Sequence, residues 1–70
     1  MKSLPIVEVL NEETLTWREV TIAEATLALI QEYGEDHHRA IAELKDNTAL
    51  PSAIGFLRIA PEWFLKEGGV

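Results

Sequence analysis

The strongest pattern of apolar and polar positions in the chain predicts a helix over residues 21–33. At about 100° per residue, apolar side chains cover roughly 200° of its surface. The remaining polar strip consists of Glu24, Ala28, Gln31 and Glu32. Thr21 and Glu24 match a capping box at its start, and Gly34 suits its end. So much apolar surface needs cover from other elements or from a partner, so we expect this helix to be the central element.

A β-hairpin is predicted before this helix, over residues 6–18. Its first strand is rich in β-branched residues, and its second alternates polar positions with Leu15 and Trp17. Because an isolated hairpin is marginal in water, we expect it to pack on the central helix, with Trp17 as the residue that clamps it there. Residues 1–5 are expected to form a frayed lead-in.

A second helix is predicted over residues 36–46. Its narrow apolar stripe contains Ala40, Ile41 and Leu44, which indicates contact with the core along one line only. The pattern also allows a single kinked helix with Gly34 inside it.

Pro51 marks a boundary between elements, because a residue before proline avoids helical geometry. An apolar segment over residues 52–66 follows this boundary. We expect this segment to be helical, with Ser52 as its N-cap. Residues 53–60 also suit a buried strand, since a short apolar run does not distinguish the two. Pro61 favours the first position of a last helical turn, which ends near Lys66.

These elements predict one α+β domain: an N-terminal β-hairpin packed on a central α-helix, then a second helix and an apolar C-terminal helical segment. A chain of 70 residues allows a single domain, over residues 1–70. A domain of this size buries only about 60% of the surface of its unfolded chain. Without cysteine, such a domain often gains its missing burial from an oligomer or a partner.

The residues that commonly perform chemistry form no recognisable motif. His37 and His38 are adjacent, so on a helix they point about 100° apart and cannot easily bind one ion. We expect His37 to be half-buried and His38 to lie on the surface. Phosphate-binding loops, nucleophile elbows and zinc-helix motifs do not occur. We therefore expect no enzyme, no cofactor and no metal; a small metal-binding protein or enzyme remains a second alternative.

The net charge of −6 disfavours direct binding to nucleic acid or anionic membranes. The carboxylates either keep the protein soluble or imitate the phosphates of nucleic acid. No uncharged run approaches the roughly 20 residues that span a bilayer, and the N-terminus is charged too early for a signal peptide. We expect a soluble cytoplasmic protein.

The aromatic pair Trp63–Phe64 is the most prominent interaction feature. Each ring would bury about 150–250 Å² if covered, either by closing the base of the core or by anchoring a partner. The predicted partner-binding surface combines these rings with carboxylates. The carboxylates are Glu12, Glu13, Glu32, Glu35 and Asp36.

The junction between hairpin and helix reads Arg18-Glu19-Val20-Thr21-Ile22-Ala23-Glu24. Together with the preceding strands, it resembles the opening of small phage tail-assembly chaperones, in which a short hairpin leads into an Arg-Glu-x-Thr-x-x-Glu helix start. The resemblance covers residues 7–24 and implies an assembly factor, with no catalytic residues.

The sequence thus predicts a non-catalytic protein-interaction module, an assembly factor or regulator that binds a protein partner or forms a homo-oligomer. The alternative is an acidic inhibitor that mimics phosphates and blocks a nucleic-acid-binding protein. Salt distinguishes the two, because a phosphate mimic binds mainly through screened charges.

Overall fold

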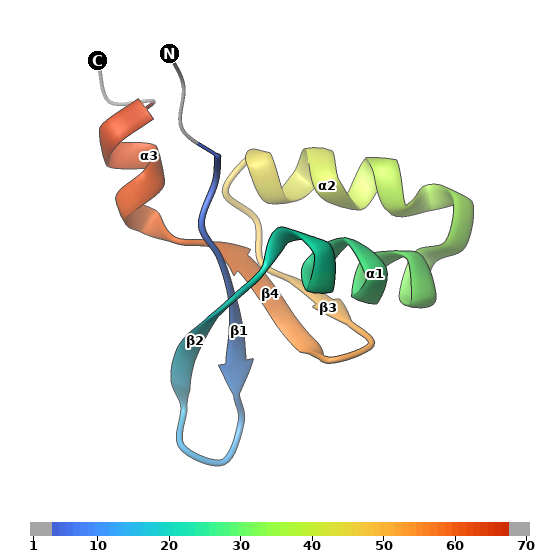
Figure 1. Cartoon of the computed structure of the whole chain (residues 1–70), viewed down its shortest axis with the longest axis horizontal. Helices are drawn as coiled ribbons and strands as arrows, with labels where there is room; N and C mark the ends of the chain where they lie inside the picture. The colour runs from blue at the N-terminus through green and yellow to red at the C-terminus, as the bar shows by residue number, and fades with distance from the viewer. Residues whose placement is uncertain (1–3, 68–70) are drawn as a thin grey trace.

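The computed structural model describes residues 4–67, which form an antiparallel sheet of four strands with helices beside it (Figure 1). The sheet has the order β2-β1-β4-β3. Its strands are β1 (Val7–Asn11), β2 (Thr16–Val20), β3 (Leu50–Ser52) and β4 (Gly55–Ile59). The prediction of an α+β fold is confirmed. The lead-in predicted over residues 1–5 falls partly on residues 1–3, which lie outside the described residues.

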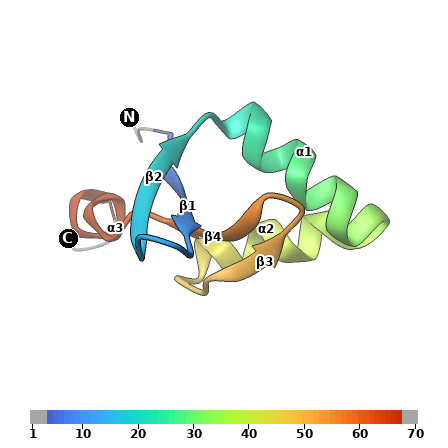
Figure 2. The same cartoon turned by 90° about the horizontal axis from the view of Figure 1, so that it is seen from below.

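Two of the three α-helices pack together, and the third lies apart from them. Helix α1 (Ile22–Tyr33) and helix α2 (His37–Lys45) are joined by the 3-10 turn η1 (Gly34–Asp36). They form a pair, and the short helix α3 (Pro61–Glu67) stands apart from them at the opposite end of the molecule (Figures 1 and 2). The chain therefore has two helices where the sequence pattern also allowed a single kinked one.

Helix α1 begins and ends where its capping residues predict. The Thr21 hydroxyl accepts a hydrogen bond from the Glu24 N–H at 3.0 Å, and the Thr21 N–H donates to the Glu24 carboxylate at 3.4 Å. Gly34 ends the helix with a positive φ of 59°, and its N–H donates to the Ile30 carbonyl. The capping box satisfies two N–H groups that the helix itself leaves unpaired.

The core lies between the sheet and the pair α1–α2. In the register, Val7 stands between Val20 of β2 and Ile59 of β4. Leu29 and Leu57 are the most buried large side chains, with exposed fractions of 1% and 0%. The core contains Val7, Val9, Val20, Ala25, Leu29, Ala40, Leu44, Leu57 and Ile59.

Ala28 does not belong to a polar strip of α1, as the sequence pattern suggested, because it is only 2% exposed. The turn after β3 lies against it, and the Ala53 N–H donates to the Ala28 carbonyl at 3.4 Å. A small side chain permits this close approach of a second backbone.

The prediction that Trp17 clamps the hairpin onto the central helix is wrong. Successive residues of a strand point to opposite faces, and the register pairs Trp17 with Leu10, whereas Val9 faces α1 and α2. The predicted alternation starts at Leu15, but Leu15 belongs to a turn and β2 begins only at Thr16. Val20 is the residue that β2 contributes to the core.

The C-terminal segment predicted as helical over residues 52–66 is helical only from Pro61 onward. Residues 50–59 form the hairpin β3–β4, so the strand alternative for residues 53–60 holds for β4. The Ser52 hydroxyl caps the hairpin turn instead of a helix, since it donates to the Gly55 carbonyl at 2.6 Å and accepts from the Ile54 N–H at 3.3 Å. Gly55 has a φ of 122°, a backbone conformation that residues other than glycine rarely adopt.

Candidate protein-interaction surface

The face of the sheet turned away from α1 and α2 carries the candidate site. Strand alternation places Leu10 of β1, Trp17 of β2 and Phe56 of β4 on this face. Phe56 is 40% exposed, and Leu10 and Trp17 are half-buried. We call these three residues the open-face patch; they place apolar side chains on three neighbouring strands.

Arg58 holds the tryptophan of the open-face patch in place. Its Nη2 and Nε each lie 3.0 Å from Oε1 of Glu8 on the adjacent strand. Its guanidinium carbon lies 4.0 Å from the centroid of the Trp17 ring. A guanidinium above an aromatic ring contributes about 0.5–1 kcal/mol at an exposed site. The pair therefore orients the indole ring before any partner arrives.

The two hairpin turns meet at one end of this face. Between them is a hollow of about 400 Å³. It is lined by Leu10, Asn11, Glu12, Glu13, Ile54 and Gly55. Leu15 and Ile54, one in each turn, are 74% and 45% exposed. Leu10 of the open-face patch lines the hollow together with Ile54, so apolar side chains continue from the patch to the β3–β4 turn.

Leu15 adopts a left-handed backbone conformation, with a φ of 57°. This conformation costs a residue other than glycine roughly 1–2 kcal/mol. The Asn11 side chain stabilises the turn, because its Oδ1 accepts from the N–H groups of Glu13 at 2.9 Å and Thr14 at 3.3 Å. A large apolar side chain held exposed on a strained backbone is typical of a functional position.

A second apolar surface lies on α1. Ile22, Leu27 and Ile30 are 40%, 56% and 41% exposed. Beside the start of α1, an apolar groove of about 240 Å³ separates it from α2. Its lining includes Leu4, Ile22, Leu29, Ile41 and Leu44. The apolar surface that the sequence predicted for this helix is therefore only partly covered within residues 4–67.

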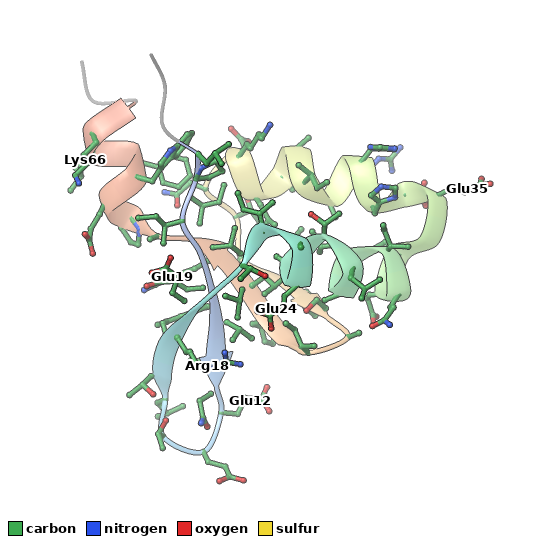
Figure 3. The ribbon with its side chains drawn as sticks, in the orientation of Figure 1. Glu12, Arg18, Glu19, Glu24, Glu35 and Lys66 are labelled. Atoms are coloured by element: carbon green, nitrogen blue, oxygen red, sulfur yellow. The ribbon has the colours of Figure 1, made fainter. Side chains whose placement is uncertain are left out.

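The residues predicted to form one partner-binding surface lie in separate regions. Glu12 and Glu13 belong to the β1–β2 turn, whereas Glu32, Glu35 and Asp36 surround the turn between α1 and α2. Figure 3 shows Glu12 and Glu35 at distant ends of the molecule. The acids therefore do not form a single array.

The predicted aromatic anchor lies in α3. Trp63 and Phe64 contact each other edge to face, with ring centroids 5.3 Å apart. Both rings are partly buried against the core cluster. The role of Trp63 as a partner anchor stays a prediction.

Sequence reasoning missed the open-face patch. Alternation in β2 identified Trp17 as a strand residue, but only the pairing of β1 with β4 shows which face is covered. Phe56 was hidden in a run of apolar residues without a clear period. The missing information was the sheet order, which a single sequence does not contain.

The histidines lie as their positions predict. His37 is half-buried with Nδ1 2.8 Å from the Gly34 carbonyl oxygen, and His38 is exposed. Their ring centroids are 4.0 Å apart. Within residues 4–67, no group of three or more potential metal ligands comes together.

No protein-family model, curated protein or solved structure matches this chain. The resemblance to tail-assembly chaperones therefore stays a prediction. In the part of the chain that the structure describes, none of the helices has the length and apolar character needed to cross a bilayer. The fold and the candidate site together define a small α+β domain with an exposed apolar surface on its sheet.

Proposed function

We propose that the protein is a non-catalytic protein-interaction module, an assembly factor or regulator that binds a protein partner through the open-face patch. The observation that carries this proposal is the position of Trp17, which lies beside Leu10 on the uncovered face and under the guanidinium of Arg58. A protein interior would normally hide such a ring, whereas interfaces are enriched in tryptophan and arginine.

The charges of this face support an apolar contact. Glu8 and Arg58 neutralise each other across the strands, which leaves Glu19 as a charged neighbour of Trp17 in β2. Because the ion pair is already formed, a partner does not need to strip water from two isolated charges. Rigid aromatic anchors with few conformations also lose little entropy on binding.

A pull-down from the native host tests the proposal. The tagged full-length chain is compared with Trp17→Ala and with Leu65→Ala, whose side chain is 77% exposed in α3. We expect a partner that resists a high-salt wash, is lost with Trp17→Ala and is retained with Leu65→Ala. Thermal melts confirm that both variants fold.

Two outcomes would contradict the proposal. Capture that survives Trp17→Ala unchanged would remove the open-face patch from the interface. Release of a basic nucleic-acid-binding partner by salt alone would favour the acidic-inhibitor alternative, because exposed charges are screened within about 8–10 Å at physiological salt.

A further inference from the structure

We infer that the outer edge of β2 binds an extended segment of a partner protein, which joins the sheet as a fifth strand. This inference rests on the proposed function and deepens it, because a strand added there lies directly beside Trp17. It follows from a difference between the two edges of the sheet.

The edge formed by β3 is closed. This strand has only three residues, and Pro51 at its centre has no N–H to donate. The Tyr33 hydroxyl donates to the Pro51 carbonyl at 2.7 Å, so the acceptor is also occupied. Helix α1 therefore covers this edge and prevents further pairing.

The edge formed by β2 lacks these protections. The strand pairs with β1 over five consecutive residues without a bulge, and it contains no proline. Within residues 4–67, no strand lies on its other side. An edge of this kind is a template for another strand.

The backbone groups that face outward can be assigned from β1. The Ala60 N–H donates to the Ile6 carbonyl at 2.7 Å, so Ile6 bonds toward β4. Backbone groups alternate in direction along an antiparallel strand, so Glu8 also bonds toward β4 and its neighbour Val9 bonds toward β2.

The partner of Val9 in β2 is Arg18, whose backbone groups therefore point inward to β1. By the same alternation, the N–H and C=O groups of Trp17 and Glu19 point away from the sheet. Two donors and two acceptors are thus available to an added strand, at the residues that flank Arg18.

Side chains of β2 define the chemistry of that strand. The register places Arg18 and Glu19 on opposite faces (Figure 3). Charges directly opposite each other stabilise strand pairs when their signs differ. The partner segment therefore carries an acidic residue opposite Arg18, a basic residue opposite Glu19 and an aromatic residue opposite Trp17.

A second copy of this chain does not fit the edge. If two copies pair through their β2 edges, the two-fold axis that relates them is normal to the sheet. One residue of β2 then lies directly opposite the same residue of the second copy. Centred on Arg18 or Glu19, the pairing opposes like charges. Centred on Trp17, it ends at the left-handed backbone of Leu15, which has a φ of 57°.

The test uses a synthetic peptide, acetylated and amidated at its ends, with the core Val-Lys-Glu-Phe-Thr. Antiparallel pairing sets its lysine opposite Glu19, its glutamate opposite Arg18 and its phenylalanine opposite Trp17. The full-length protein is titrated with it by NMR, and amide hydrogen exchange is measured. We expect saturable shifts in β2 and slower exchange at the N–H groups of Trp17 and Glu19.

Matched peptides separate strand pairing from simple apolar contact. N-methylation of the peptide lysine and phenylalanine removes the two donors that face β2, so binding should weaken about tenfold or more. N-methylation of the peptide glutamate, whose N–H points away from β2, should leave binding nearly unchanged. Exchanging the lysine and the glutamate should weaken binding about two- to fivefold.

A charge-reversed protein gives an independent test. Arg18→Glu should bind the original peptide about two- to fivefold more weakly, and a peptide with lysine in place of its glutamate should restore the affinity. Arg18 is exposed on β2, so the variant should fold like the parent.

Absence of a saturable shift would overturn the inference, as would concentration-dependent protection of Trp17 and Glu19 without peptide, which would indicate self-pairing. Equal binding of the doubly N-methylated peptide would also overturn it. Equal binding of that peptide would leave the proposed function standing, since the open-face patch would still bind. The proposed function itself would be contradicted by a pull-down in which capture of the partner does not depend on Trp17.

Discussion

Leu15 shows how one residue can lower stability and still be useful. Its backbone is left-handed and its side chain is 74% exposed, so the burial of this side chain contributes little stability to offset the backbone strain. Leu15→Gly should raise the free energy of unfolding by about 0.5–1 kcal/mol, because glycine adopts this conformation without strain. Urea denaturation measures the change.

Leu15→Ala is the control for this prediction, because alanine keeps the Cβ atom and therefore the strain. It should be no more stable than the parent. A glycine variant that is less stable than the alanine variant would show that the turn is not strained. If Leu15 also contacts the partner, the glycine variant should bind it more weakly although it is more stable.

Tyr33 gives the protein a pH dependence above the neutral range. Burial raises the pKa of its hydroxyl above the usual value of 10.0, and the carboxylates of Glu32 and Glu43 raise it further. The neutral hydroxyl, which donates to the Pro51 carbonyl, is therefore favoured by folding. Its contribution is fully present below about pH 10 and is lost as the pH rises through the raised value.

Tyr33→Phe tests this contribution. At pH 7 the variant should be less stable by about 0.5–1.5 kcal/mol, the usual net value of a hydrogen bond. The difference between parent and variant should stay constant up to about pH 10 and shrink over the range above it, since only the parent has a hydroxyl to ionise there. Urea midpoints measured across this range check the prediction, and a constant difference would contradict it.

At the level of the elements, α1 offers a matched pair of leucines. Leu29 is 1% exposed in the core, and Leu27 is 56% exposed on the outer side of the same helix. Leu29→Ala should lower the free energy of unfolding by about 2–5 kcal/mol, because it leaves a cavity. Leu27→Ala should change it by about 0.5 kcal/mol or less. Similar unfolding midpoints for the two variants would contradict the assignment of α1 as the central helix.

Local chemistry determined which elements could be predicted from the sequence. The start of α1 depends on contacts three residues apart, between Thr21 and Glu24, so the sequence displays it directly. Strand faces depend on long-range pairing instead. The sequence favours Trp17 as the core residue because nothing near it reveals that Val9 and Leu57, which pair across β1 and β4, face the helices instead.

The same reason explains the error over residues 53–60. Ser52 binds an N–H two residues later, which is the local geometry that helix caps and tight turns share. Pairing of β4 with β1 and β3 on its two sides is what makes this segment a strand. The candidate site was therefore beyond local reasoning, because its residues come from three strands that become neighbours only through this pairing.

For the whole molecule, β4 connects the two ends of the chain. It pairs with β1, and its Arg58 bonds Glu8, fifty positions earlier. A fragment that ends at Asn47 would lack Leu57 and Ile59, and Val7 and Val9 would lose their cover. We expect this fragment to lose cooperative unfolding in urea, monitored by circular dichroism. A sharp transition would show that the first hairpin and the two helices fold alone.

The contact of Tyr33 with Pro51 also limits how these molecules can assemble. Growth of a fibre by edge pairing needs two reactive edges on every unit, as a polymer needs monomers with two functional groups. Here α1 has occupied one edge, so each molecule has a valence of one for strand addition. Pairing at β2 therefore terminates with a single added strand, and a protein with an exposed edge avoids uncontrolled polymerisation.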